Sequence, residues 1–309
     1  MANKFQPLDL SKVKTYSLSG RPSKVTTDEF ARIWQTGSSF RVFLESLPDI
    51  LAGRDLREVI SAISDAYVDN RTVIFGMGAH VIKCGLNPII IDLMERGIIT
   101  SVAMNGAGII HDVELAMIGR TSEDVAAALG DGSFGMALET CAFLGQAVKD
   151  VNGNKTGLGE AVGRAIIDKQ LPMMDQSILA AGARLGIPVT VHVAIGTDII
   201  HMHPGFDPQK TGAATHRDFR LFSSIVATLE KGVYLNVGSA VILPEIFLKA
   251  ATLVRNLGYS LDEFTTVNLD FIKHYRPLTN VIARPTAKGG QGISIVGHHE
   301  ILLPLMQQG

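Results

Sequence analysis

Short apolar runs rich in β-branched residues recur along the chain after residue 70, and a stretch with helical periodicity follows most of them. Each run ends in small or polar residues. Continuous apolar strands that alternate with helices are typical of a parallel sheet covered on both faces. The pattern therefore predicts an α/β fold with strands near residues 72–75, 101–104, 188–193, 233–236, 264–268 and 293–297.

The helical patterns define the remaining organisation. We expect N-terminal helices within residues 27–67, divided at Pro48 and Gly53. Residues 1–25 are polar and mixed, so we interpret them as an N-terminal arm that precedes a single α/β domain at residues 26–309. Further helices are expected at 81–96, at 110–169 with breaks near 130–134 and 152–157, at 217–230, at 244–257 and from about 298 onward.

Composition excludes several classes of protein. Among 309 residues, 28 are basic and 30 acidic, and this near balance argues against nucleic acid as a partner because phosphate binding needs a basic surplus. A hydrophobic content of 46% excludes a disordered chain. No apolar run approaches the roughly 18–20 residues of a membrane helix, and the first residues lack the apolar core of a signal peptide. With two cysteines, Cys84 and Cys141, we expect a cytoplasmic protein that does not bind membranes.

Small and polar residues gather where the predicted strands end. In parallel sheets, ligands bind beyond the carboxyl ends of the strands, and so many small residues there favour a nucleotide-sized ligand. The alternative is that turns contain glycine for conformational reasons alone. There is no G-x-G-x-x-G fingerprint, because Val81 stands where the third glycine would be. The candidate cofactor contacts are Gly76, Gly78, Ala79, His80, Asn105, Gly106, Gly108, Asp198, Gly238, Ser239, Asn268, Gly297 and His298.

Histidines near the same strand ends are candidates for acid–base chemistry. His111 is followed by Asp112, which could orient it as a general acid or base. His201 and His203 follow Asp198 and could contact substrate or, with the nearby carboxylates, bind a metal; their spacing matches no strong zinc signature, so we expect no metal. Each histidine alone could equally cap a helix or bond within the core. His216 is expected in the loop after His203.

A basic segment lies between the last two strands. Residues 271–292 hold four Lys and Arg residues and no acid. Arg276 and Arg284 are candidates to bind an anionic group of the substrate, Lys288 is a candidate catalytic residue, and Glu245 after the Gly238 turn could be a second catalytic carboxylate. A solvated surface loop is the alternative.

Between about residues 70 and 305 the chain resembles the deoxyhypusine synthase family. The segments from Gly78 to Gly85 and from Asn105 to Asp112 correspond to the family's Thr-Ser-Asn and Thr-Ala-Gly-Gly turns, and residues 238–241 to its Gly-Gly-Gly-Val turn. This resemblance implies a Rossmann-like domain, bound NAD, and a homotetramer, a dimer of dimers, with sites at the subunit interfaces.

Departures from that family alter the expected substrate. The family's catalytic lysine follows Trp-Gly, but this chain has Arg284 between Ala283 and Pro285, with Lys288 close by. The family's acidic polyamine-binding loop is replaced by the basic residues 271–276, and a family acid near the cofactor by His298. Deoxyhypusine synthesis itself is therefore not expected.

A second resemblance is to the NAD-binding domain of ornithine cyclodeaminase-like (LOR/SDH) proteins. That domain has Gly-Asn-Ala-Leu-Ala-x-His-Asp-Ile-Glu where this chain carries residues 104–114, including Asn105, His111, Asp112 and Glu114. Together the resemblances imply an NAD(H)-dependent enzyme that acts on a small amine or amino acid with an anionic group, through transient oxidation and an imine. The alternatives are a metal-dependent hydrolase or lyase that uses Asp198, His201 and His203, and a non-catalytic nucleotide-binding protein.

Overall fold

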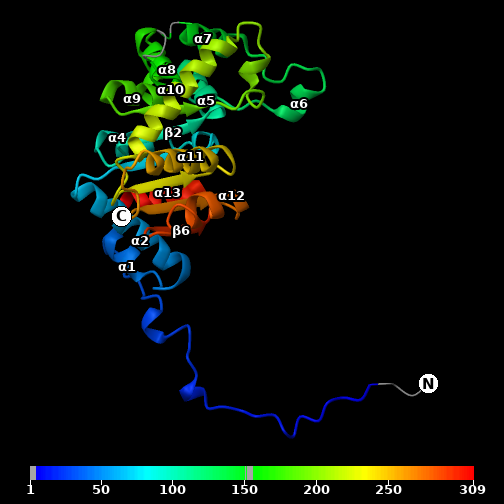
Figure 1. Cartoon of the computed structure of the whole chain (residues 1–309), viewed down its shortest axis with the longest axis vertical. Coiled ribbons are helices and arrows are strands. Elements are labelled where there is room, and N and C mark those ends of the chain that lie inside the picture. Colours follow the sequence, from blue (N-terminus) through cyan, green and yellow to red (C-terminus); the bar gives the residue numbers. More distant parts are fainter. Residues whose placement is uncertain (1–4, 150, 152–155) are drawn as a thin grey trace.

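The computed structural model describes residues 5–149, 151 and 156–309 and contains a six-stranded parallel sheet (Figure 1). Its strand order is β3-β2-β1-β4-β5-β6, with every neighbouring pair parallel. The order reverses between β1 and β4, which is the position where doubly wound sheets bind ligands. The expected Rossmann-like α/β fold is confirmed. The strands are β1 Val73–Met77, β2 Ser101–Asn105, β3 Val189–His192, β4 Val233–Val237, β5 Thr265–Asp270 and β6 Gln291–Val296.

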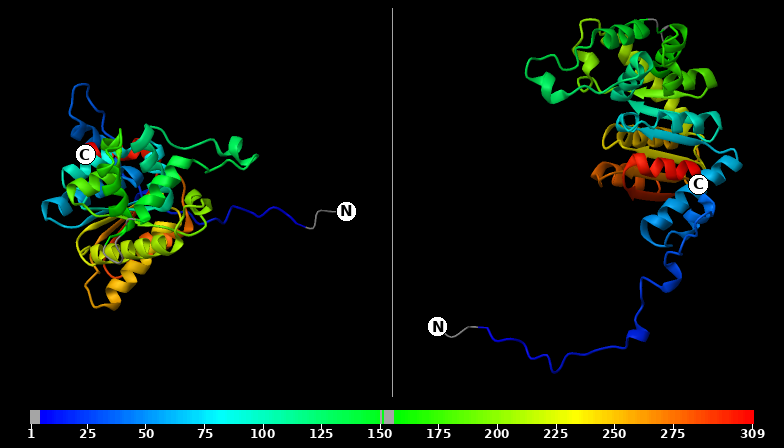
Figure 2. Two further views of the ribbon diagram at one scale, coloured as in Figure 1. Left: turned by 90° about the horizontal axis from the view of Figure 1, so that it is seen from above. Right: turned by 180° about the vertical axis from the view of Figure 1, so that it is seen from behind.

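Helices cover both faces of the sheet, and Figure 2 shows α10 and α11 on the side opposite α13. On one face a core forms from β1, β2 and β4 with α2 Leu51–Val68, α4 Asn87–Glu95, α5 Gly106–Ile118, α7 Leu138–Lys149, α8 Leu158–Asp168, α9 Ile178–Leu185 and α13 His299–Gln308. On the other face a core forms with α10 Pro208–Val226, α11 Ile242–Asn256 and the π-helix η5 Leu278–Ala283.

Alternation along the strands divides the apolar side chains between these cores. In β4, Val233 and Leu235 join the first core and Tyr234 joins the second, where its ring stacks on Phe247 at a centroid distance of 3.8 Å. Both sets are buried, which explains why the strands are continuous apolar runs in the sequence.

The N-terminal region is less helical than the sequence predicts. After the 3₁₀ turn η2 Thr27–Glu29, no helix forms until α1 Phe40–Ser46, where the Ser39 hydroxyl accepts a bond from the Val42 N–H. The predicted break at Pro48 is confirmed, whereas Gly53 lies within α2. Residues 5–25 are exposed and extend away from the sheet (Figures 1 and 2). Their one helical element is the 3₁₀ turn η1 Leu18–Gly20.

Several other helices begin or end at residues that differ from those predicted. The expected helix at 81–96 is two helices, α3 His80–Lys83 and α4, separated at Gly85 with φ +74°. The long expected helical block contains α5, α6 Val125–Leu129, α7 and α8. The predicted break at 152–157 falls mostly on residues outside the described part. α10 begins earlier than predicted because Asp207 caps it, so His216 lies in a helix and not in a loop.

In the part of the chain that the structure describes, no helix is both long enough and apolar enough to cross a membrane.

Asp218 links two elements of the first core. Its Oδ2 atom accepts bonds from the backbone N–H groups of Gly159 at 3.0 Å and Val191 at 2.8 Å, so this carboxylate of α10 joins the start of α8 to β3. Burial raises the pKa of Asp218 to about 7, although the backbone donors oppose the shift.

We expect the free energy of unfolding to depend on this group. Because the folded pKa of Asp218 lies above its unfolded value of 3.8, the folded state holds the proton more tightly, and stability from this group declines as the pH rises from about 4 to about 7. The decline is about 1.4 kcal/mol per pH unit at most. Urea denaturation across this range should show a flatter profile for Asp218→Asn, and an unchanged profile for Asp168→Asn, at the exposed end of α8. Equal slopes for wild type and Asp218→Asn would contradict this expectation.

Candidate functional site

A cavity of about 830 Å³ runs along α5 from its start at the carboxyl edge of the sheet. The chain that follows α5 and the loop after β3 form the other walls. Four acidic side chains line the cavity, against two basic ones and one histidine. The acidic residues are Glu114, Glu123, Glu139 and Asp198, the basic ones are Lys83 and Arg120, and the histidine is His111.

His111 is held in the cavity wall by a chain of hydrogen bonds. Its Nδ1 atom lies 2.6 Å from the Thr121 hydroxyl oxygen, and that hydroxyl donates to Glu114 Oε2 at 2.5 Å. Because the hydroxyl proton points to the carboxylate, His111 Nδ1–H must be the donor to Thr121. The Thr140 hydroxyl donates to the other Glu114 oxygen at 3.1 Å. His111 Nε2 is therefore the unprotonated nitrogen, and it has no hydrogen-bond partner among the described residues.

The surroundings of His111 favour its neutral form. Burial lowers the pKa of His111, the Glu114 carboxylate opposes this, and Lys83 adds to the lowering. A neutral imidazole with a free Nε2 can accept a proton near neutral pH.

The predicted pairing of His111 with Asp112 is wrong. Asp112 is fully buried and points to the start of α9, where it accepts bonds from the Ser177 hydroxyl and from the backbone N–H groups of Ile178 and Leu179. The Asn87 amide donates a fourth bond at 3.1 Å. Consecutive residues of a helix face different directions, so Asp112 cannot orient His111, whereas Glu114 lies one turn further on the same face. Asp112 is a structural residue.

Asp198 presents an unsatisfied acceptor at the mouth of the cavity. Its Oδ2 atom is buried and has no hydrogen-bond partner in the described part of the chain. This oxygen lies so close to Gly106 that a Cβ atom there would stand 2.0 Å from it. Burial raises the pKa of Asp198, and His201 opposes the shift. A ligand hydroxyl or ammonium group would supply the missing donor.

His201 lies beside Asp198, whereas His203 does not. His201 Nδ1 accepts the backbone N–H groups of Gly196 and Asp198 at 3.1 and 3.2 Å and so shapes this loop, and its buried Nε2 atom has no hydrogen-bond partner among the described residues. His203 lines a separate small hollow with Cys141. Within the described residues, no group of three His, Cys, Asp or Glu side chains could hold a metal ion.

At the point where the strand order reverses, the ends of β1 and β4 meet. A Cβ atom at Gly78 would lie 2.1 Å from the Gly238 carbonyl oxygen, and Gly238 has φ +63°, so glycine is required at both positions. His299 lies against Gly238, is only 1% exposed, and has no partner for either ring nitrogen among the described residues. The His80 ring lies 5.9 Å from the His299 ring. His299 is a candidate ligand contact that the sequence analysis missed.

The other predicted cofactor contacts have structural explanations. Gly76 lies within β1 against the Tyr234 hydroxyl, while Gly108 and Gly297 pack against Met104 and Leu302. Side chains at three more positions make bonds within the fold: Asn105 Oδ1 caps α5, Ser239 Oγ accepts from the start of α11, and Asn268 accepts from Asn236. Ala79 precedes α3, and the exposed His298 has its Nδ1 atom 3.6 Å from Glu300.

The basic segment does not line the cavity. Arg276 lies 3.4 Å from Glu245, which also accepts from Asn280, and Arg284 donates to Asn280 at 2.8 Å. These residues form one network that joins α11, the short helix α12 Tyr275–Pro277, η5 and the residue after it, on the opposite face of the sheet from α5. Lys288, the candidate catalytic residue, precedes β6 and therefore lies at the amino edge of the sheet, away from the cavity beside α5.

Several cavity residues escaped the sequence analysis. Thr121, Thr140, Glu123 and Glu139 come from chain that follows α5, and no spacing rule places them beside it. Glu114 was detectable, since it lies three residues after His111 on a helix, a separation that places two side chains on one face.

Comparison with known proteins supports the fold. Neither a protein-family model nor a curated protein sequence matches the chain. Similar solved structures include AgrE bound to ornithine and NAD+, at 14% identity and TM-score 0.54, which covers 84% of this chain and 33% of AgrE. A LOR/SDH protein from Methanococcus maripaludis S2 has 15% identity and TM-score 0.52, over 96% of this chain and 74% of that one. ArgZ, an arginine dihydrolase from cyanobacteria, has 13% identity and TM-score 0.50, over 82% and 30%. The chain thus spans about a third of AgrE and of ArgZ, and the similarity shows a shared fold.

The role of Asp112 can be tested by stability. We expect Asp112→Ala to lower the free energy of unfolding by about 3–5 kcal/mol, because four buried donors lose a charged acceptor. Chemical denaturation measures this loss. The control Asp168→Ala, at an exposed position, should change stability by about 0.5 kcal/mol or less. A stable Asp112→Ala protein would show that Asp112 does not hold α9 in place.

Proposed function

We propose that this protein is an NAD-dependent enzyme, with His111 as the acid–base residue acting on a small amine or amino acid in the cavity beside α5. The observation that carries the proposal is the His111–Thr121–Glu114 hydrogen-bond chain in the wall of this cavity. It fixes the tautomer of His111 and leaves Nε2 free to receive a proton.

The residues at the carboxyl edge fit a dinucleotide. Asp198 Oδ2 and the ring nitrogens of His299 are buried polar atoms without partners among the described residues, and ribose hydroxyls and amides can bond to such groups. They lie on opposite sides of the β1 end, so a ligand that reaches both must extend along the edge. AgrE, with a similar fold, was crystallised with NAD+ and ornithine. Bound NAD would accept a hydride from a substrate carbon.

His111 would manage the accompanying proton. As a carbon next to an amine loses hydride, the nitrogen must lose a proton for the C=N bond to form, and Nε2 takes it. The resulting imidazolium stays bonded through Thr121 to the Glu114 carboxylate, which stabilises the positive charge. The same group can return the proton when the imine reacts further.

Charge in the cavity supports an amine or amino acid as the substrate. Acidic side chains outnumber basic ones there, so an ammonium group is favoured. Lys83 and Arg120 could hold a carboxylate. These two residues replace Arg276 and Arg284 as candidates for the anionic end, because the latter pair lies outside the cavity.

Turnover and cofactor binding together test the proposal. We expect the purified protein to bind NAD in calorimetry and to reduce it in a screen of amines and amino acids, followed by reduced-nicotinamide absorbance. His111→Gln should keep NAD affinity within a few-fold and lower kcat by about 10²–10⁴-fold. The control His216→Gln, at an exposed position on α10, should leave kcat unchanged. Absence of NAD binding would overturn the proposal; binding without turnover would favour a non-catalytic nucleotide-binding protein.

The pH profile provides a second test. Because His111 must be neutral to accept a proton and its pKa is lowered by burial, kcat/KM should rise with pH through a pKa below the ordinary histidine value of 6.5 and then level off. Glu114 raises the pKa of His111, so Glu114→Gln should move this acid limb to lower pH and also lower kcat. An acid limb that does not move in Glu114→Gln would exclude Glu114 as the partner of His111.

A further inference from the structure

The N-terminal arm, residues 5–25, carries apolar side chains that are largely exposed. Phe5, Leu8, Leu10, Tyr16 and Leu18 are each more than 70% exposed. Isolated exposed apolar residues are ordinary, but so many in one extended segment mark an interaction site. The arm is also basic, with Lys12, Lys14, Arg21 and Lys24 against the single acid Asp9.

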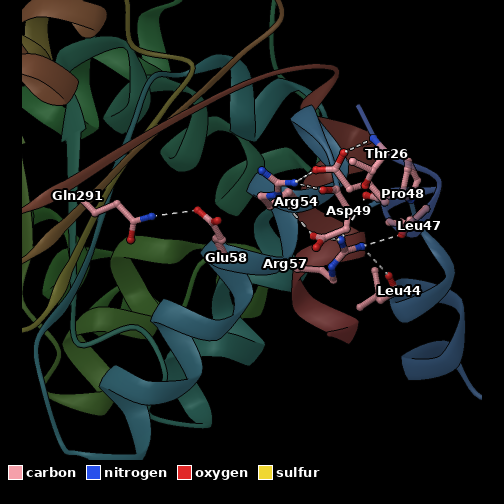
Figure 3. A network of polar contacts seen from close by, with 10 residues as sticks. Thr26, Leu44, Leu47, Pro48, Asp49, Arg54, Arg57, Glu58 and Gln291 are labelled. Atoms are coloured by element: carbon pink, nitrogen blue, oxygen red, sulfur yellow. Dashed lines mark hydrogen bonds and ion pairs between the residues drawn. The ribbon is translucent and has the colours of Figure 1, made fainter. Parts of the chain in front are cut away.

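Residues 26–29, which follow the arm and are called its root here, are bound to the start of α2 (Figure 3). The Glu29 carboxylate accepts the Thr26 N–H at 3.0 Å and an Arg54 N–H at 2.7 Å, and the Asp49 N–H donates to the Glu29 carbonyl at 2.8 Å. Arg57 adds a 2.7 Å bond to Asp49. These contacts hold the root against α2 and so set the direction of the arm, which extends away from the sheet in Figures 1 and 2.

A groove whose charge is opposite to that of the arm lies at the amino edge of the sheet, away from the cavity beside α5. Its volume is about 480 Å³, and it is bounded by the second half of α2 and the starts of β4, β5 and β6. Ala62 is a partly exposed apolar residue of its lining, whereas Val233 and Phe264 behind it are buried. Its charged lining residues are Glu58, Asp65, Asp69 and Glu263, with Lys231 as the one base among them.

We propose that the N-terminal arm of one copy of this chain binds in the amino-edge groove of a second copy, in a reciprocal exchange. Basic residues of the arm would meet the acidic residues that line the groove. This would give the chain a self-associating surface at the edge of the sheet opposite the proposed active site.

The direction of the arm favours its binding in the groove of a second copy over binding in the groove of its own chain. The root contacts Arg54 near the start of α2, whereas the groove is flanked by Asp65 and Asp69 near its end, roughly 17 Å further along the helix. To reach its own groove the arm would have to reverse beside α2. Extended, its residues span about 70 Å, which is enough to cross to a neighbouring copy without a reversal.

Isotope-mixed cross-linking tests which groove is occupied. Unlabelled and ¹⁵N-labelled full-length protein are mixed, equilibrated and treated with a carbodiimide, which joins lysine amines directly to carboxylates. We expect mass spectrometry to find Lys12 or Lys14 joined to Asp65 or Asp69 in peptide pairs that combine labelled and unlabelled chains. Pairs of a single isotope alone would show that the arm binds its own groove, and absence of these pairs would show that it binds neither; both results overturn the proposal.

Charge reversal tests the same contact by equilibrium measurement. Sedimentation should show self-association of the full-length chain that weakens at least tenfold in Lys12→Glu/Lys14→Glu, a change outside the folded body, and in Asp65→Lys/Asp69→Lys. Combining all four substitutions in one chain should restore much of the association. The control Asp168→Lys, at the exposed end of α8, should have no effect. A monomeric wild-type chain, or association that neither pair of substitutions weakens, would overturn the proposal.

Discussion

Parallel pairing of all six strands is the constraint on which the rest of this structure depends. Parallel strands need crossover connections, and these place helices over both faces of the sheet. The same pairing brings every carboxyl end to one edge. Residues as far apart in the chain as Gly78, Asn105, Gly238 and His299 therefore lie along a single border, and the reversal of strand order between β1 and β4 opens the position where doubly wound folds bind ligands.

The candidate chemistry lies to one side of that reversal. The hydrogen-bond partners of His111 come from the chain that follows its own helix. Thr121 and Thr140 lie beside α5, and the Thr121 hydroxyl links the imidazole to the Glu114 carboxylate. Asp112, its neighbour in sequence, faces the core and caps α9 instead. Two adjacent ionisable residues thus have separate roles, one facing a cavity and one holding helices together.

Charge is distributed between separate parts of the molecule. The cavity beside α5 is mainly acidic, whereas Arg276 and Arg284 belong to a network with Glu245 and Asn280 on the opposite face. The acidic groove lies at the amino edge, away from the proposed active site, and the basic arm begins beside the start of α2 and extends away from the sheet. Self-association through the amino edge would therefore leave the carboxyl edge open to small molecules.

The sequence by itself determined the sheet, because a strand buried on both faces must be apolar at successive positions, and that pattern is local. It also determined that Asn105 lies at the end of β2 and that His111 lies on the helix that follows. Tertiary structure decided the rest. Lys288 is near Arg284 in sequence but reaches the amino edge because η5 runs back along the sheet, and Asp112 turns away from His111 because side chains radiate around a helix. The partners of His111 and the isolation of Asp198 and His299 depend on contacts between distant segments, and no local pattern encodes them.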